Sequence, residues 1–182
     1  MRIHRYVIRK DAGSAPNYEP PAVTLAVCKP RIRKKATVGD LVVAFAGKTL
    51  NAHEPHTVVW AGLVSEKFTF ADYWRDPRFE AKKPAGSKNP DNFYMPCGEG
   101  LLQVENPVHG PDQMNRDTRG EYVLVFSTAW RFGGSGPILP VDFGLRITGG
   151  RRGERVSDSS PREAERLMEW LTETQSACSA GK

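Results

Sequence analysis

Cysteine is scarce in this chain of 182 residues, and long hydrophobic runs are lacking. The three cysteines, Cys28, Cys97 and Cys178, are far apart and odd in number, which argues against a disulfide framework. No CxxC pair occurs, so we expect no thiolate metal site and no bound metal. No stretch approaches the roughly 18 consecutive apolar residues of a membrane helix, and the charged N-terminus lacks the apolar core of a secretory signal. We therefore expect a cytoplasmic protein with free thiols and no membrane contact.

Phosphate-loop motifs are lacking as well. The glycine-rich stretch 130–137 has neither GxGxxG spacing nor a GK[ST] sequence, and we expect no cofactor. Hydrophobic residues make up 39% of the chain and charged residues 26%, which is enough for a core and argues against disorder. We expect one domain over residues 1–175, followed by a flexible tail of small polar residues over 176–182.

Positive charge is concentrated at one end of the chain. The formal net charge is +5, but residues 1–50 hold ten Lys and Arg against three Asp and Glu. The remaining residues hold sixteen against eighteen, so the first quarter carries all of the excess. Such asymmetry indicates an anionic partner, most commonly nucleic acid, or else a basic surface that only contacts solvent.

Short apolar and β-branched runs, separated by glycine, proline and asparagine, predict a chain built mainly of strands. The predicted strands are Ile3–Arg9, Ala22–Val27, Leu41–Ala46, Val58–Val64 and Tyr122–Phe126. Their irregular spacing predicts a mainly β, α+β fold, namely a small, partly closed, mixed or antiparallel β-barrel with short helices.

One clear helix is predicted near the C-terminus. Ser160 is a candidate N-cap, Pro161 suits the first helical position, and Glu163 completes a capping box. An apolar stripe at helical spacing follows, formed by Ala164, Leu167, Met168 and Leu171. A shorter helical turn is predicted over Phe70–Arg75.

The densest group of cations lies between Cys28 and Lys35, directly after the second predicted strand. If this segment is an extended loop, Arg31 and Arg33 point to the same side, where their guanidinium groups suit phosphate oxygens. We predict that Lys29, Arg31 and Arg33 bind phosphate. The alternative is a solubilising sheet edge that discourages strand pairing.

Five polar residues are candidates for binding a nucleobase, because their side chains suit its hydrogen-bonding edges. They lie in the loop 11–17 and after the basic loop 81–92, and are Asp11, Asn17, Asp91, Asn92 and Tyr94. For Asp11 and Asn17 the alternative is that they close turns locally. We predict that these residues and the cationic segment form one concave binding site.

The sequence assigns no catalytic residue. A neighbouring lysine such as Lys29 can activate a cysteine, but no histidine partner for Cys28 is evident among four scattered histidines. We therefore interpret Cys28 as a small core residue at the end of a strand. The long segment Cys97–Gly120 has little periodicity, which is typical of mobile or functional loops.

An ordered set of short motifs covers about residues 3–171. They are Asp11-x-Gly13-x-Ala15-Pro16-Asn17, Leu25-Ala26-x-Cys28-Lys29-Pro30-x-Ile32-Arg33, Gly39-Asp40, Glu66-Lys67-x-Thr69-Phe70-x-x-Tyr73-Trp74-x-Asp76-Pro77-Arg78-Phe79, Lys82-Lys83-Pro84 and Asp91-Asn92-Phe93-Tyr94. In this order the motifs resemble the second family of nucleotide-modification-associated domains of bacteria and phages. The β-rich pattern also bears a looser likeness to PUA, EVE and ASCH folds.

The resemblance implies a role linked to modified nucleobases, preferentially in DNA, and a nucleic acid or nucleotide as partner. Three functions follow from it and from the residues above. The first is a module that recognises a modified or extruded base beside a phosphate-binding loop. The second is an enzyme that modifies a nucleotide or DNA base through Asp11, Cys28 or Asp91. The third is a protein-interaction subunit of a modification or defence complex.

Overall fold

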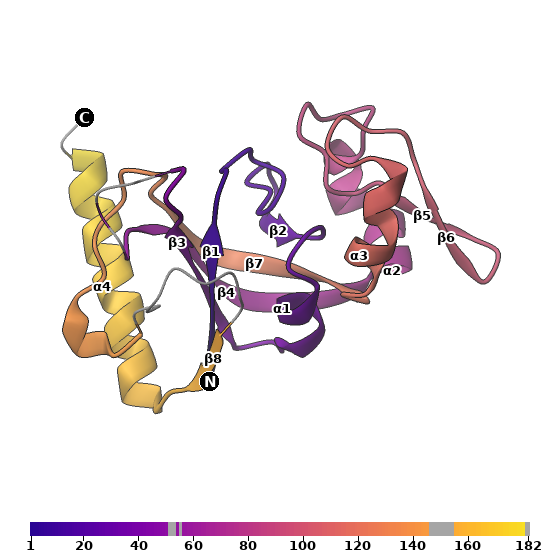
Figure 1. The fold of residues 1–182 in the computed structure, drawn as a ribbon. Coiled ribbons are helices and arrows are strands. Elements are labelled where there is room, and N and C mark those ends of the chain that lie inside the picture. The colour runs from indigo at the N-terminus through magenta and orange to yellow at the C-terminus, as the bar shows by residue number, and fades with distance from the viewer. Residues whose placement is uncertain (51–53, 55, 146–154, 181–182) are drawn as a thin grey trace. The chain divides into compact units, whose positions relative to one another are not determined.

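The computed structural model describes the chain except for residues 51–53, 55, 146–154 and 181–182 (Figure 1). The strands are β1 (Arg2–Ile8), β2 (Val23–Leu25), β3 (Leu41–Ala46), β4 (Val58–Thr69), β5 (Tyr94–Cys97), β6 (Gly100–Gln103), β7 (Tyr122–Arg131) and β8 (Arg155–Asp158). The α-helices are α1 (Pro30–Lys35), α2 (Phe70–Arg75), α3 (Met114–Thr118) and α4 (Pro161–Ala180). Three 3₁₀ helices cover Pro77–Lys82, Pro111–Gln113 and Val141–Phe143.

Six strands form one mixed sheet in the order β2-β7-β4-β3-β1-β8, and β5 pairs with β6 in a separate hairpin. β1 runs parallel to β3 and antiparallel to β8, and β3 runs antiparallel to β4. The predicted mainly β, α+β class is therefore confirmed. The predicted barrel closure is wrong, because in the described part of the chain the sheet ends at β2 and β8. These strands have only three and four residues, and short strands are typical of open sheet edges.

The predicted single domain over 1–175 contains two compact units. The first comprises residues 1–11, 39–63 and 128–182. Its core combines apolar side chains of β1, β3 and β4 with the end of β7 and with α4. The fully buried members of this core include Ile3, Leu41, Val58, Leu167 and Leu171.

Helix α4 begins as predicted. The Ser160 backbone N–H donates to Glu163 Oε2 at 2.8 Å, and the Glu163 N–H donates back to Ser160 Oγ at 3.3 Å. This reciprocal capping satisfies N–H groups that have no partner inside the helix. The segment 176–182, predicted as a flexible tail, continues the helix as far as Ala180.

The second unit comprises residues 12–38 and 64–127. Its core gathers aromatic side chains from α2, the following 3₁₀ helix and β5, together with valines of β7. Phe70, Tyr73 and Phe79 all belong to this core. The unit also contains nearly all of the polar residues considered below.

The sequence argued against a membrane-spanning helix and against a disulfide framework. No described helix is both long and apolar enough to cross a membrane. The three cysteines are free thiols; Cys28 is half-buried, whereas Cys97 and Cys178 are exposed.

Candidate active site

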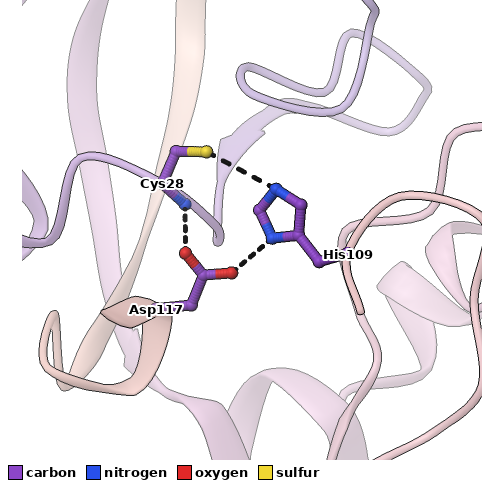
Figure 2. Close-up of side chains that lie close together, drawn as sticks. All are labelled: Cys28, His109 and Asp117. Atoms are coloured by element: carbon purple, nitrogen blue, oxygen red, sulfur yellow. Dashed lines mark hydrogen bonds and ion pairs between the residues drawn. The ribbon is translucent and has the colours of Figure 1, made fainter. Parts of the chain in front are cut away.

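Three residues from distant parts of the sequence meet in the second unit. Cys28 lies in the turn between β2 and α1, His109 in the loop after β6, and Asp117 on α3. Figure 2 shows the imidazole of His109 between the thiol of Cys28 and the carboxylate of Asp117. A thiol, an imidazole and a carboxylate in this order are the arrangement of a cysteine nucleophile with its base and orienting acid.

The distances join the three side chains into one chain of contacts. Cys28 Sγ lies 3.7 Å from His109 Nε2, and His109 Nδ1 lies 2.5 Å from Asp117 Oδ2. The Cys28 backbone N–H donates to Asp117 Oδ1 at 2.9 Å, which fixes Cys28 relative to the carboxylate. A proton can therefore move between sulfur and Nε2 while the carboxylate holds Nδ1 protonated.

The backbone that presents Cys28 is strained. Cys28 has φ +57° and Lys29 has φ +42°, so two consecutive non-glycine residues adopt the left-handed conformation. Such residues cost of order 1–3 kcal/mol each and cluster at active sites. A strained turn between a strand and a helix also presents the serine nucleophile of α/β-hydrolases.

Loop residues hold His109 in place. Asn106 Oδ1 accepts the backbone N–H groups of Val108 and His109 at 3.0 and 2.9 Å. Gln103 Nε2 donates to the His109 carbonyl at 2.7 Å. The ring of Phe93 meets the imidazole edge to face, with 6.2 Å between centroids. The orientation of the imidazole is therefore set by several independent contacts.

Asp117 is fully buried, yet it is the best satisfied group of the site. Besides His109 and the Cys28 N–H, it accepts a hydrogen bond from Tyr94 Oη at 3.0 Å. Burial alone favours the neutral acid, but the hydrogen bond and charge of His109 outweigh it and lower the pKa of Asp117. Burial and the nearby Asp117 charge raise the pKa of Tyr94, so the phenol remains a hydrogen-bond donor.

His109 is cationic at neutral pH in this environment. The hydrogen bond to Asp117, followed by the contact with Cys28, raises the pKa of His109 to about 9. An imidazolium beside a sulfur favours its thiolate, which is the nucleophilic form of cysteine. The structure therefore places a cationic imidazole at the sulfur of Cys28.

The three predicted phosphate ligands lie in different environments, because the cationic segment is a helix and not the extended loop that we predicted. Pro30, with its fixed φ, suits the start of α1. Residues two apart point in nearly opposite directions on a helix, so Arg31 is exposed and Arg33 is buried. Lys29 is half-buried directly after Cys28. Phosphate binding by Lys29 and Arg31 stays a prediction.

Arg33 instead stabilises the turn that contains Cys28 from inside the unit. Its Nε donates to the Cys28 carbonyl at 2.7 Å and its Nη1 to the Tyr122 carbonyl at 2.7 Å, while Nη2 donates to the Asp117 carbonyl. The side chain is fully buried and its three nitrogens have these backbone partners, so it is not exposed to a phosphate. Arg33 joins the segments that carry Cys28 and Asp117.

Gly120→Ala is expected to lower the free energy of unfolding by about 2–4 kcal/mol, since a Cβ there would lie 2.4 Å from Arg33 Cζ. Urea denaturation measures this change. Gly100→Ala is the control. The Cβ added there would lie 3.8 Å from the carbonyl oxygen of Cys97, which is an ordinary van der Waals distance. If the two variants are equally stable, Arg33 does not need the space above Gly120.

The predicted base-binding residues of the second unit are all buried. Asp91 accepts hydrogen bonds from Thr24 Oγ1 at 2.6 Å and from Tyr73 Oη at 2.8 Å. Asn92 Nδ2 donates to the carbonyls of Tyr73 and Phe79, Asn17 Nδ2 donates to that of Asn89, and Tyr94 binds Asp117. These partners are internal, so base binding by Asn17, Asp91, Asn92 and Tyr94 stays a prediction.

A buried lysine completes the network around Asp91. Lys82 Nζ donates to the Ala22 carbonyl at 2.8 Å and to Thr24 Oγ1 at 2.9 Å, and lies 3.3 Å from Asn17 Oδ1. Burial lowers the pKa of Lys82 and raises that of Asp91. This network ties β2 to the segment 82–92.

Asp11 belongs to the first unit. Its Oδ2 lies 3.8 Å from the guanidinium of Arg131 in the same unit. Its predicted role in base binding stays a prediction.

Cys28, His109 and Asp117 are also a possible set of metal ligands, with one donor atom from each within 4.8 Å of the others. The sequence pattern contained no indication of this set. However, Nδ1 of His109 faces Asp117, so only Nε2 and the Cys28 sulfur are directed toward a shared ion. Zinc sites use three or four protein ligands, so the geometry fits proton transfer better than metal binding.

Sequence reasoning missed His109 and Asp117. They lie 81 and 89 positions from Cys28, too far for any spacing motif to join them. The available indication was indirect: both lie in the aperiodic segment 97–120, whose length alone suggested a functional loop.

Comparison with family models gives a match along nearly the whole chain. The model described as nucleotide modification associated domain 2 matches residues 1–181. Comparisons with curated proteins and with solved structures found no match.

Proposed function

Because the chain belongs to the nucleotide modification associated domain 2 family, we propose that it is a cysteine-dependent enzyme acting on a nucleotide or nucleobase. The observation that carries this proposal is the hydrogen-bonded series of Cys28, His109 and Asp117. A structural cysteine requires neither an imidazolium at its sulfur nor a strained turn, and Cys28 has both.

The proposed reaction is nucleophilic substitution at an electrophilic sp² carbon, such as a carbonyl or amidine carbon. The Cys28 proton is on His109 Nε2 when Sγ bonds to the carbon, and the π electrons of that carbon move to its oxygen or nitrogen. The double bond then forms again, and the leaving group departs with the proton from Nε2. Water then adds to the thioester or thioimidate with His109 as base, and the S–C bond breaks to restore the thiol. General acid–base catalysis of this kind contributes roughly 10²–10⁴-fold in rate.

Asp117 is a positioning residue in this scheme. It holds the protonated Nδ1 so that Nε2 faces the sulfur, and its charge stabilises the imidazolium. Tyr94 in turn donates a hydrogen bond to Asp117. The nucleotide supplies phosphate groups, for which Lys29 and Arg31 are the nearest cations along the chain.

Cys28 is expected to react with iodoacetamide at least about tenfold faster than Cys97 and Cys178 at pH 6.5. An ordinary thiol is about 1% thiolate at this pH, and an imidazolium beside the sulfur, as His109 is here, favours the nucleophilic thiolate. The tenfold figure allows for the lower intrinsic nucleophilicity of a stabilised thiolate. Mass spectrometry of the three cysteine peptides over time measures each rate in one sample.

The two exposed cysteines are internal controls, because neither lies in the candidate site. A chelator in the buffer distinguishes the ion pair from a metal thiolate, since it leaves an ion pair unchanged. Equal rates at all three cysteines contradict the proposed nucleophile.

A second candidate function is binding of nucleic acid without chemistry, as a module that recognises a modified base. It is favoured by the exposed cations of α1, which are Arg31, Lys34 and Lys35. The alkylation experiment separates the two functions, because a binding module does not require Cys28 to be more reactive than Cys97 and Cys178.

A further inference from the structure

A second cation lies beside the sulfur of Cys28. Arg116 extends from α3, and its Nη2 is 3.9 Å from Cys28 Sγ. Its Nε is 3.7 Å from Asp117 Oδ1, and 51% of the side chain is exposed. The guanidinium therefore lies between the buried acid and solvent, at the reacting atom. Neither the proposed reaction steps nor the family match assigns it a role.

Arg116 is placed to bind an anion at the site. Its half-exposed guanidinium lies beside Cys28 Sγ and Asp117 Oδ1. A positive charge in a partly buried place favours a bound anion. Arginine presents five N–H donors, more than its contacts with Cys28 and Asp117 use.

We propose that Arg116 binds a phosphate group of the substrate, so that the enzyme acts on a phosphorylated nucleotide and not on a free base or nucleoside. This inference rests on the proposed function of Cys28. A guanidinium binds phosphate through two parallel hydrogen bonds, and the half-exposed position lets a ligand reach it. The contact with Sγ places that phosphate within one nucleotide's length of the reacting carbon.

The first test compares an anionic and a neutral reagent at the same sulfur. Iodoacetate and iodoacetamide both form an S–C bond to Cys28 and release iodide, but only iodoacetate has a carboxylate for Arg116 to bind. We expect the iodoacetate to iodoacetamide rate ratio to be about tenfold higher at Cys28 than at Cys97 and Cys178. Arg116→Gln is expected to remove this difference.

Arg119→Gln is the matched control, since Arg119 is an exposed arginine at the end of the same helix, where its backbone N–H caps the Asp117 carbonyl, a bond that the substitution keeps. In this variant the iodoacetate to iodoacetamide rate ratio at Cys28 should remain as high as in the native protein. A ratio that is the same at all three cysteines, or one that survives Arg116→Gln, overturns the proposal.

The second test does not need a reactive cysteine. In a Cys28→Ser background, calorimetry measures the binding of inorganic phosphate, and adding Arg116→Gln is expected to raise the Kd at least tenfold. A nucleoside 5′-monophosphate and a short oligonucleotide are titrated in the same way, and the ligand that binds more tightly shows whether the phosphate belongs to a free nucleotide or a strand.

Phosphate binding that is absent, or unchanged by Arg116→Gln, rejects the Arg116 site. Slow alkylation of Cys28 by both reagents rejects the nucleophile separately.

Discussion

Lys82→Met is expected to lower the free energy of unfolding by about 3–5 kcal/mol, as measured by urea denaturation. The substitution keeps the apolar stem but removes an ammonium that donates to the Ala22 carbonyl and to Thr24 Oγ1. Asp91 then remains buried without a compensating positive charge. The two charges interact across Thr24 Oγ1, which accepts from Lys82 and donates to Asp91. Removing one of two coupled buried charges costs about this much, because the other cannot reach water.

Two further variants identify the cause of this loss. Lys88→Met is the matched control, since Lys88 is exposed in the same segment and should change stability by less than about 0.5 kcal/mol. Adding Asp91→Asn to Lys82→Met removes the uncompensated charge. We expect the double variant to be more stable than the sum of the single variants by about 1–3 kcal/mol. Additive losses contradict an electrostatic coupling between Lys82 and Asp91.

The Lys82 network also shows what the sequence pattern cannot reveal. The segment 81–92 has the composition of an exposed loop, rich in lysine, proline, glycine and asparagine, and lysine is rarely buried. Lys82 is nevertheless fully buried, because hydroxyl and carbonyl groups of distant segments meet its ammonium. Only the three-dimensional fold brings those partners together.

Local patterns did predict the regular elements. The five predicted strands are present, and Leu41–Ala46 has the predicted bounds. Helix α2 and the capping box of α4 are confirmed as well. These features depend on residues within a few positions of one another, which a sequence shows directly. Barrel closure depends on which edges pair across the chain, and there the prediction failed.

The extended conformation that we predicted for the cationic segment was wrong for a physical reason that applies beyond this protein. A row of basic residues after a strand has the same composition whether it is extended or helical, but the directions of its side chains differ. In α1, Arg31 faces solvent while Arg33 binds the carbonyls of Cys28, Tyr122 and Asp117. Charge alone does not distinguish an exposed arginine from one that stabilises the fold.

His109→Asn is expected to remove a pH dependence of stability that amounts to about 3 kcal/mol in the native protein. The pKa of His109 is raised from about 6.5 in the unfolded chain to about 9 in the folded one, through its hydrogen bond to Asp117 and its contact with Cys28. A raised pKa stabilises the folded state fully below pH 6.5, and this contribution is lost as the pH rises through 9. Urea denaturation at pH 6.5, 8 and 9.5 measures the loss.

Other groups also titrate above pH 8, so the informative quantity is the difference in unfolding free energy between native protein and His109→Asn at each pH. This difference should be about 3 kcal/mol larger at pH 6.5 than near pH 10, because a neutral asparagine has no proton to lose. In the same variant, alkylation of Cys28 at pH 6.5 should fall to the rate of Cys97, since no imidazolium then stabilises the thiolate. A variant that loses stability equally at every pH while Cys28 stays reactive would show that His109 only packs against Phe93 and the loop. Loss of both the pH dependence and the reactivity would instead establish that one proton on His109 links the stability of the fold to the chemistry of the sulfur.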